Sequence, residues 1–415
     1  MNKMKDNTLC SDTSKCCGCF ACKDVCPKDA VTIARDKAGF LYPVIDKEKC
    51  VACGLCSKVC GYKNGNDGNE PVKVFAAASK NDAVLMNAAS GGLFSVMARA
   101  FVKNGGVVCG SAMSRTEAGF EVRHVFADNE DDLKKFAGSK YVKSSTDGVF
   151  REAENILRSG KQLLFSGTPC QVAALKSFLR KEYDGLVTVD LICHGVPSLK
   201  FFNDYISFYE EKNSCEVMDF QFRDKSRGQG MNYRITEKNG DKIREKVKNG
   251  KLSSYFGMFL KGATYRNNCY SCPYASEKRV SDITIGDYWG IYQEHSDEIS
   301  KAGLDNRKGI SCALINTDKG CEFWNSISEE LNYFESEFRK VAAHNEQLQK
   351  PSSKAANRKK VLNSYINGGY KAVDEIYSNE IRIKKYPYIL EFYMPKSLKR
   401  NLKKAASSLR NKGRK

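Results

Sequence analysis

The chain has 415 residues, of which 41% are hydrophobic, and it carries a formal net charge of +18. This length suits two or three domains, and the composition excludes a largely disordered chain. We find no apolar stretch typical of a signal peptide or long enough to span a bilayer, so we expect a cytoplasmic protein. The 18 cysteines are therefore expected to be reduced and to bind metal rather than to form disulfides.

The first feature along the chain is a pair of cysteine runs with the same spacing, C-x2-C-x2-C-x3-C. The first run ends at Cys26-Pro27 and the second at Cys60. This spacing is typical of a bacterial ferredoxin with two 4Fe–4S clusters, in which the fourth cysteine of each run binds the cluster of the other run. The predicted ligands are Cys16, Cys19, Cys22 and Cys60 for one cluster, and Cys50, Cys53, Cys56 and Cys26 for the other.

Two residues depart from the simplest ferredoxin pattern. Gly61 stands where the first run has Pro27, and Cys17 is an extra thiol with no place in the two-cluster scheme. Zinc binding is the alternative, because C-x2-C pairs also bind zinc, although zinc sites have longer gaps between the pairs. Between the runs, short strands are expected at 30–34 and 40–45.

A stretch rich in Gly and Asn at 61–71 follows the second run and predicts a linker. We therefore place a ferredoxin domain at 1–68 and an α/β region at 72–150. In the second region, Ser90-Gly91-Gly92 precedes a predicted helix, with Ser90 as the expected N-cap. Small residues at a helix N-terminus allow a phosphate to approach the free amides, so these three are candidate cofactor-binding residues. An ordinary N-cap turn is the alternative.

A compact polar loop at 137–144 offers hydroxyl, ammonium and phenol groups close together. Such a loop is typical of a functional site, although a solvated loop is the alternative. Lys140 and Tyr141 are candidates to orient a ligand or to carry a proton, and Ser139 is a candidate cofactor contact.

Two apolar strands, at 161–167 and 186–192, each lead into a helix in the next region, 151–320. The short return between them predicts parallel neighbours with a right-handed crossover. Residues that follow such strands meet at the edge where open α/β sheets bind ligands. Cys170 and Cys193 are expected to converge at this edge. Thr168 and Gln171 are candidate cofactor contacts there, and His194 is a candidate to orient a ligand or to carry a proton.

A further C-x2-C pair, Cys269 and Cys272, lies in a loop rich in Tyr and Arg. Together with Cys170 and Cys193 it supplies four thiols, which is the ligand number of a third 4Fe–4S cluster. The alternative is that Cys170 and Cys193 are small buried residues, while the C-x2-C pair binds zinc or no metal.

The last region, 321–415, has a polar and helical pattern. From Pro395 onward it contains nine Lys or Arg and no acid, with Leu398, Leu402 and Leu409 on one helical face. This tail is a candidate for binding an anionic membrane surface on the inner face of the cell membrane. A solvated basic tail is an equal alternative.

Six short motifs occur one after another along the chain. They are Ser90-Gly91-Gly92, Gly138-Ser139-Lys140-Tyr141, Gly167-Thr168-Pro169-Cys170-Gln171, Cys193-His194-Gly195-Val196-Pro197-Ser198, Cys269-x2-Cys272, and Ser281-Asp282-Ile283-x2-Gly286-Asp287-Tyr288-Trp289-Gly290. Over residues 10–320 this order resembles the family of coenzyme F(420) hydrogenase/dehydrogenase beta subunits. The resemblance implies FAD, iron–sulfur clusters and two-electron chemistry on an organic substrate, such as a deazaflavin coenzyme. Similar bacterial proteins accompany polysaccharide-synthesis enzymes, which also suggests a sugar-related substrate.

The overall expectation is an α+β protein with a two-cluster ferredoxin domain, an α/β flavin and iron–sulfur region, and a helical basic extension. Clusters carry one electron each and a flavin collects two, so electrons from a reduced ferredoxin-like or other donor protein are expected to reach the substrate through FAD. The alternative is a non-catalytic electron-transfer component of a larger redox complex. Nucleic-acid binding is disfavoured, because no recognition motif accompanies the positive charge.

Overall fold

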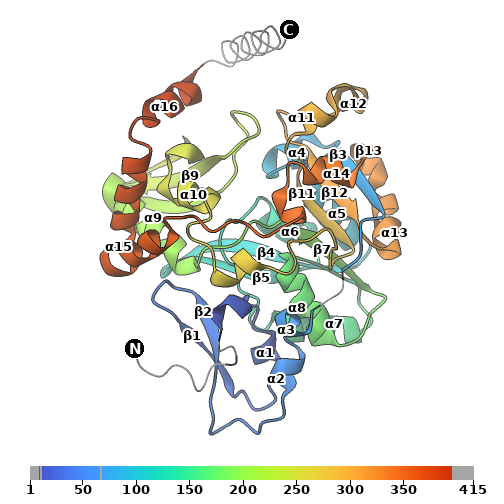
Figure 1. Ribbon diagram of the computed structural model, residues 1–415. Helices are drawn as coiled ribbons and strands as arrows, with labels where there is room; N and C mark the ends of the chain where they lie inside the picture. Colours follow the sequence, from blue (N-terminus) through green and yellow to red (C-terminus); the bar gives the residue numbers. More distant parts are fainter. Residues whose placement is uncertain (1–8, 10–11, 66–67, 395–415) are drawn as a thin grey trace.

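A computed structural model describes Leu9, residues 12–65 and residues 68–394, and its centre is an eight-stranded mixed sheet (Figure 1). The strands are β3 (Lys73–Ser79), β4 (Val107–Thr116), β5 (Gly119–Ala127), β6 (Leu163–Gly167), β7 (Leu186–Leu191), β11 (Ile283–Asp287), β12 (Ser311–Ile315) and β13 (Leu331–Ser336). Their order is β13-β3-β12-β11-β7-β6-β4-β5, with β11, β7, β6 and β4 parallel and the others antiparallel to their neighbours.

The sheet confirms one prediction about its strands and corrects another. β6 and β7 are parallel neighbours, with Leu163 opposite Leu186 and Gly167 opposite Asp190, so both strands end at the same edge as predicted. The purely helical pattern expected after residue 320 is wrong at β13, which pairs with β3. β13 lies at the sheet edge, where alternate residues face solvent, so its sequence reads as polar rather than as a core strand.

Helices cover both faces of the large sheet. α5 and α13 pack with β3, β12 and neighbouring strands around Met97 and Trp324. On other parts of the sheet, α7 and α8 pack around Phe150 and Phe165, and α11, α12 and α14 pack around Ile291 and β12. The helices of this region are α4 (Asp82–Asn87), α5 (Leu93–Lys103), α6 (Glu130–Leu133), α7 (Val149–Arg158), α8 (Pro169–Leu179), α11 (Ile291–Glu294), α12 (Ser296–Lys301), α13 (Asp318–Ile327) and α14 (Phe338–Ala342).

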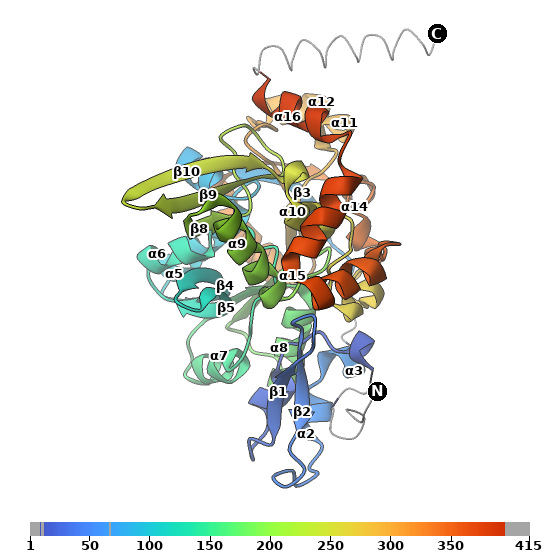
Figure 2. The ribbon, with the colours of Figure 1, turned by 90° about the vertical axis from the view of Figure 1, so that its left-hand side faces the viewer.

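A second, smaller layer lies beside the large sheet. It joins a three-stranded antiparallel sheet to helices from the middle and the end of the chain (Figure 2). These elements pack around an aromatic core that includes Phe202, Phe220 and Tyr255. Within the described residues, no helix combines the length and apolar character needed to cross a membrane. The elements are α9 (Leu199–Asn213), β8 (Glu216–Gln221), β9 (Asn232–Asn239), β10 (Lys242–Asn249), α10 (Ser254–Leu260), α15 (Arg358–Glu380) and α16 (Lys385–Tyr393).

The N-terminal module packs against α7 and α8 at one end of the molecule (Figure 1). Its elements are α1 (Ala21–Asp24), β1 (Val31–Arg35), β2 (Leu41–Ile45), α2 (Leu55–Lys58) and α3 (Gly61–Asn64). The expected linker is wrong at its start, because residues 61–64 form α3 and pack on α8. A Cβ atom at Gly61 would lie 3.1 Å from the backbone of Ala173, so glycine permits this close approach. The basic tail predicted from Pro395 onward lies outside the described residues.

Candidate functional site

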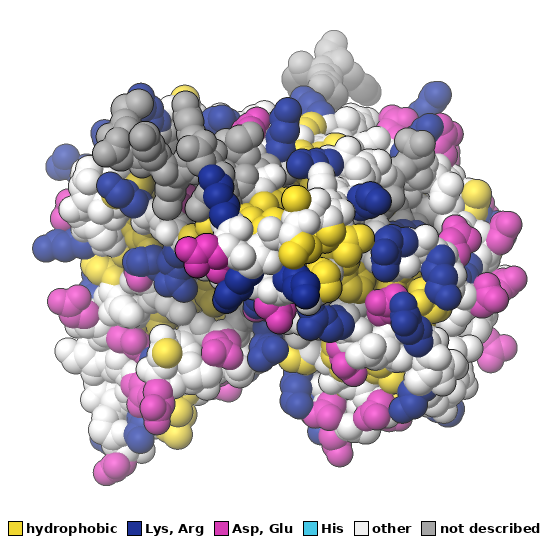
Figure 3. All heavy atoms as spheres, turned by 90° about the horizontal axis from the view of Figure 1, so that it is seen from below, with side chains coloured by type: hydrophobic (Ala, Val, Ile, Leu, Met, Phe, Trp, Pro, Cys, Tyr) yellow, Lys and Arg dark blue, Asp and Glu magenta, His cyan; other side chains and the backbone are white. Residues whose placement is uncertain are grey.

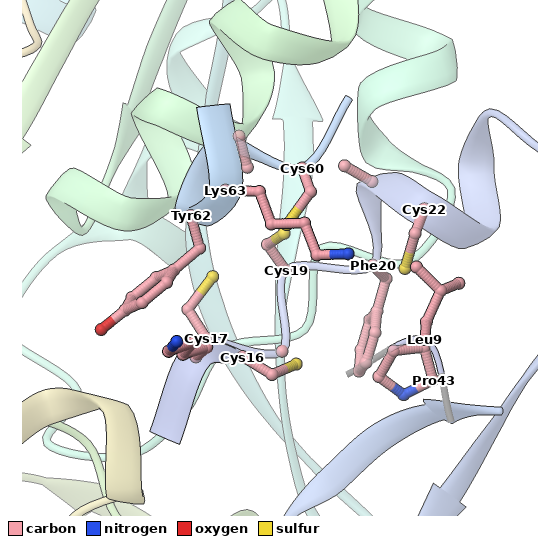
Figure 4. A pocket seen from close by; sticks show the side chains of 14 residues that line it. Leu9, Cys16, Cys17, Cys19, Phe20, Cys22, Pro43, Cys60, Tyr62 and Lys63 are labelled. Atoms are coloured by element: carbon pink, nitrogen blue, oxygen red, sulfur yellow. The ribbon is translucent and has the colours of Figure 1, made fainter. Parts of the chain in front are cut away.

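Four of the eight motif cysteines surround one cavity in the N-terminal module (Figure 4). The cavity has a volume of about 40 Å³ and is lined by three motif cysteines of the first run and one of the second, together with the extra thiol of Cys17. Burial raises the pKa of Cys22 to about 12, and the neighbouring thiols of Cys16 and Cys60 contribute to that rise. Thiols crowded in this way need a positive centre to be held as thiolates. The four are Cys16, Cys19, Cys22 and Cys60, the set predicted for one cluster.

The other four motif cysteines line a separate cavity of about 30 Å³. Cys50 and Cys53 are exposed, and the backbone N–H of Ala30 donates to Cys26 Sγ at 3.3 Å. The fourth cysteine of each run therefore faces the cavity of the other run, as the predicted crossover requires. This set is Cys26, Cys50, Cys53 and Cys56.

The two ligand loops share one backbone conformation. Gly18 and Phe20 have φ values of 65° and 62°, and the equivalent Ala52 and Gly54 have values of 52° and 74°. Each loop thus places one glycine and one other residue in the left-handed region, which only glycine adopts without cost. These turns curl each run around its own cavity, so the arrangement of three of the four thiols is a local property of the sequence.

The third set of predicted ligands also comes together, although its members lie on three separate segments. Cys170 lies in the first turn of α8 after β6, and Cys193 follows β7. Cys269 lies within a 3₁₀ turn, Asn267–Ser271, and Cys272 is the C-cap of that turn. Burial raises the pKa of Cys193, and the nearby thiols of the other three cysteines raise it further. Burial likewise raises the pKa of Cys272 to about 12, and the nearby thiol of Cys170 contributes to this rise.

All three cysteine sets offer the donor atoms of a 4Fe–4S cluster. A 4Fe–4S cube binds each thiolate through a different iron, so its ligand sulfurs lie farther apart than the ligands of one metal ion. In the part of the chain that the structure describes, no group of three or more His, Cys, Asp or Glu side chains is arranged around one ion. The donor chemistry is four thiols in each set, which suits iron–sulfur binding.

Cys17 joins the first set to the third. Its side chain is buried, and its thiol is hydrogen-bonded with Cys170 and lies beside Cys19. Figure 4 shows Cys17 near Tyr62, on the other side of the loop from Cys22. The cysteine spacing gave this residue no role, because its partner lies in a different region of the chain.

A polar cluster around Asp287 lies at the end of β11. Arg223 Nη1 donates to Asp287 Oδ2 at 2.9 Å and to Tyr141 Oη at 3.0 Å, and Gln229 Nε2 donates to Asp287 Oδ1 at 2.6 Å. The Arg223 guanidinium also lies 5.6 Å from the ring centre of Trp289. Among the described residues, the buried Nε of Arg223 and Oε1 of Gln229 have no hydrogen-bond partner, so the cluster retains polar atoms for a ligand.

The three predicted catalytic residues separate into two groups. Tyr141 belongs to the cluster around Asp287, and the charge of Asp287 also acts on His194. Although His194 stays accessible to solvent, the protein around its ring lowers its pKa. Lys140 is engaged elsewhere, because its Nζ donates to the carbonyl oxygens of Lys135, Phe136 and Ala137. Desolvation lowers the pKa of Lys140 to about 7. A catalytic role for Lys140 stays a prediction.

The sequence analysis missed two lysines near these sites. The charge of Lys143 acts to lower the pKa of Cys17, Cys170 and Cys269, which places this lysine beside the third cysteine set. Lys225 Nζ donates to the carbonyl oxygen of Leu85 at 2.6 Å and to that of Ser90. Lys143 lies in the polar loop 137–144 but was not singled out there, and Lys225 belongs to no recognisable motif, so only the fold reveals their positions.

The glycine turn before α5 differs from its expected geometry. Gly92, with φ of 80°, is the N-cap in place of Ser90, whose Oγ donates to the Ile310 carbonyl oxygen instead. The Gly91 N–H donates to Ser311 Oγ at 2.8 Å, and a Cβ atom on Gly91 would lie 2.3 Å from the Ala77 carbonyl oxygen. Gly91 is thus required for packing, and phosphate binding by this turn stays a prediction.

The other predicted cofactor contacts have structural partners. Thr168 is the N-cap of α8, and its N–H and Oγ1 both donate to Gln171 Oε1. Gln171 Nε2 donates to the Ser144 carbonyl oxygen, while Ser139 is half-buried in the loop before it. Thr168 Oγ1 also lies 3.2 Å from Cys170 Sγ, so this cap fixes a cysteine of the third set. Direct contact of these residues with a cofactor stays a prediction.

Three family models match the chain in the order of its regions. A 4Fe–4S dicluster domain matches residues 15–64. The N-terminal part of the coenzyme F420 hydrogenase/dehydrogenase beta subunit matches residues 74–150, and its C-terminal part matches residues 160–339. The match over 74–150 includes the loop of Tyr141. The match over 160–339 includes all four cysteines of the third cysteine set.

Similar proteins extend over most of the chain. A component of the F(420)H(2) dehydrogenase of Methanosarcina mazei is 23% identical over 338 residues, which cover 77% of this chain and 84% of the relative. An uncharacterized protein of Methanocaldococcus jannaschii is 23% identical, covering 75% of this chain and 86% of the relative. A chain from the F420-reducing [NiFe] hydrogenase complex of Methanosarcina barkeri is 16% identical, with a TM-score of 0.41 over 74% of this chain and 92% of that one.

Proposed function

This chain belongs to the family of coenzyme F420 hydrogenase/dehydrogenase beta subunits, and on that premise we propose that it is an iron–sulfur flavoprotein oxidoreductase. Its ferredoxin domain makes it an iron–sulfur electron-transfer protein. We propose further that it passes electrons from a reduced donor protein to FAD and on to an organic substrate in the cytoplasm. The substrate class is a conjugated organic compound, either a deazaflavin coenzyme or a sugar-related compound.

One observation carries this proposal: the sets of reactive groups follow one another through the molecule. The second ferredoxin set has two exposed cysteines, whereas the cysteines of the first set are half-buried. Cys17 then joins the first set to Cys170 of the third. Cys193, in the third set, is followed directly by His194, on which the charge of Asp287 acts. Bound 4Fe–4S clusters carry single electrons and a bound flavin collects two, which suits a surface-to-site path of this kind.

The exposed end of this path is the proposed docking face for the donor. Cys50 and Cys53 are exposed there, and Val51 between them is 59% exposed. Figure 3 shows the molecule from the side of the ferredoxin domain, with Lys and Arg side chains interspersed with Asp and Glu around hydrophobic patches. A small acidic redox protein, such as a ferredoxin-like donor, would be attracted by the net charge of +18 that the whole chain carries. Binding of an anionic membrane by residues 395–415 remains a separate prediction.

At the inner end, the residues around Asp287 are proposed to bind flavin or substrate. Arg223 and Lys225 supply positive charge, and Tyr141 and His194 can orient a ring or hold a proton at Oη or at an imidazole nitrogen. Burial lowers the pKa of Lys225 to about 8, so this lysine keeps its proton near neutral pH. The uncapped amides of α5 near Ser90 are the proposed position for a flavin phosphate.

The test is anaerobic purification of the full chain with iron, sulfide and flavin analysis. We expect about twelve iron and twelve sulfide for three clusters, together with bound FAD. Asp287→Asn should reduce flavin content or deazaflavin reduction at least tenfold, because it removes the charge that holds Arg223 and Gln229. Asp305→Asn is the matched control, since Asp305 pairs with Arg307 at the surface.

A non-catalytic relay is the second candidate, because the relative from Methanosarcina mazei is named as one component of a dehydrogenase. A relay needs clusters and no flavin. Full cluster content without bound flavin, and no reduction of an added deazaflavin by a donor-reduced chain, would support the relay and contradict the flavoprotein proposal.

A further inference from the structure

Arg266 is a buried cation beside a predicted ligand of the first cluster. The residue is 2% exposed, and its Nε donates to the Cys16 carbonyl oxygen at 2.6 Å. Its Nη2 lies 3.4 Å from Cys16 Sγ, and its guanidinium covers the ring of Tyr42 at 4.0 Å. These contacts fix the guanidinium with an N–H group directed at the ligand sulfur.

The charge of Arg266 is not neutralised in the way that other buried arginines are. Arg279 pairs with Asp190 at 3.1 Å, and Arg223 pairs with Asp287 at 2.9 Å. Across residues 12–65 and 68–394, Arg266 forms no ion pair with a carboxylate, although its charge acts on Asp36. The anionic partner of this cation is therefore the thiolate of Cys16 and the group that it holds.

The cysteines of the first set are half-buried, and this lower exposure alone would make the first cluster harder to reduce than the second. Reduction adds a negative charge to a group already held by four thiolates, and a site shielded from water penalises that charge. The second set has two exposed cysteines, so water stabilises added charge there. A buried guanidinium that donates to a ligand sulfur acts in the same direction as water, because it stabilises the reduced state.

We propose that Arg266 raises the reduction potential of the first cluster, so that this less exposed cluster accepts electrons from the more exposed second one. The inference rests on the proposed function, because it requires both clusters to be bound. In the described part of the chain, no Lys or Arg side chain donates to the sulfurs of the second set, where the backbone N–H of Ala30 donates to Cys26. Arg266 is thus a positioning and charge-setting residue specific to the first set.

Arg266 also connects the first set to the third. Its carbonyl oxygen accepts from the Cys269 N–H at 3.0 Å, and its own N–H donates to the Val196 carbonyl oxygen at 3.0 Å. The residue therefore belongs to the ligand loop of one set and contacts a ligand of another. At this position, the positive charge of Arg266 would stabilise an added electron on the first cluster, close to the contact between Cys17 and Cys170.

The test is a redox titration of the full chain, loaded anaerobically and followed by EPR, for wild type, Arg266→Gln and Arg266→Lys. Cys22→Ala and Cys53→Ala identify which step belongs to which ferredoxin cluster. Arg358→Gln is the matched control, because Arg358 donates to the Tyr265 carbonyl oxygen and to Tyr270 Oη in the same loop without contacting Cys16.

In Arg266→Gln we expect the potential of the first cluster to fall while that of the second is unchanged. A fall of about 59 mV corresponds to a tenfold shift of electron sharing towards the second cluster. Arg266→Lys keeps the charge but loses the planar fork, so its potential should lie between the other two.

An unchanged potential in Arg266→Gln with both clusters bound overturns the proposal, and so does an equal fall in Arg358→Gln. Where Arg266→Gln does not load its first cluster, Arg266→Lys decides, and a potential at or above that of wild type overturns the proposal. Absence of iron and sulfide from the wild-type ferredoxin domain is a different result, because it contradicts the proposed function itself.

Discussion

The ferredoxin domain and the α/β region each gather cysteines in fours, but they do so by different routes. In the ferredoxin domain, each set takes three thiols from one short run, whose loop curls through residues such as Gly18 and Gly54. In the α/β region, the four thiols come from three segments held by β6, β7 and a distant 3₁₀ turn. The first arrangement therefore follows from local spacing, whereas the second depends on assembly of the sheet.

Cys26 gives the strongest test of the route used by the ferredoxin domain. It belongs to the first run but faces the cavity of the second set, so Cys26→Ala should remove the second cluster and spare the first. We expect a loss of about four iron and four sulfide from the full chain, measured by chemical analysis and EPR. Cys321→Ala, on α13, is the control that should lose none. Loss of the first cluster alone would contradict this pairing.

A second prediction tests the α/β set in the same way. Cys193→Ala should remove about four iron from the third cluster and leave both ferredoxin clusters intact, because the three sets share no ligand. Iron analysis with EPR measures the loss. Cys312→Ala is the matched control, since Cys312 is a buried cysteine of β12 outside all three sets. Equal iron content in Cys193→Ala and Cys312→Ala would leave Cys193 as a packing residue.

The third prediction concerns the stability of the fold that positions the α/β set. His124 is buried between Ser144 Oγ and the Ser166 carbonyl oxygen, and burial lowers its pKa to about 4 from an ordinary 6.5. Between pH 6.5 and 4, His124 is therefore protonated in the unfolded chain but neutral in the folded chain. Stability should fall as the pH drops from 6.5 towards 4, by up to about 3 kcal/mol.

Urea unfolding at several pH values under anaerobic conditions measures this dependence. His124→Asn should lower stability at pH 7 but flatten the curve between pH 6.5 and 4, because the titrating group is gone. Parallel curves for wild type and His124→Asn would show that another group is responsible.

The weakest effect is expected from a test of whether α15 belongs to the packed core of the second layer. A Cβ atom on Gly257 in α10 would lie 2.0 Å from Tyr377 Cζ in α15, and the ring is held by a bond from Tyr377 Oη to the Lys251 carbonyl oxygen. Gly257→Ala should therefore lower the free energy of unfolding by about 1–3 kcal/mol. Gly230→Ala is the control, because no atom lies within 4 Å of its Cβ position. Equal stability of both variants would mean that α15 moves away at little cost.

Features that depend on short spacing could be predicted from the amino-acid sequence alone. The two cysteine runs predicted which thiols share a cavity, because a C-x2-C-x2-C loop has few ways to face one space. The apolar strands β6 and β7 predicted parallel pairing, and hence that Cys170 and Cys193 lie at one sheet edge. That Cys269 and Cys272 join them was one of two interpretations of the sequence, and the tertiary structure brings both thiols near Cys193.

The contacts that join the regions were visible only once the chain was folded. Cys17 meets Cys170, and Arg266 meets Cys16 across 250 positions of the chain, with no motif to mark either pair. The linker expected after Cys60 begins as α3 because Gly61 packs on α8, which its neighbours in sequence do not reveal. Local spacing restricts a loop to a few conformations, whereas contacts between distant segments depend on how whole elements pack, so the path between the cysteine sets is a property of the assembled fold.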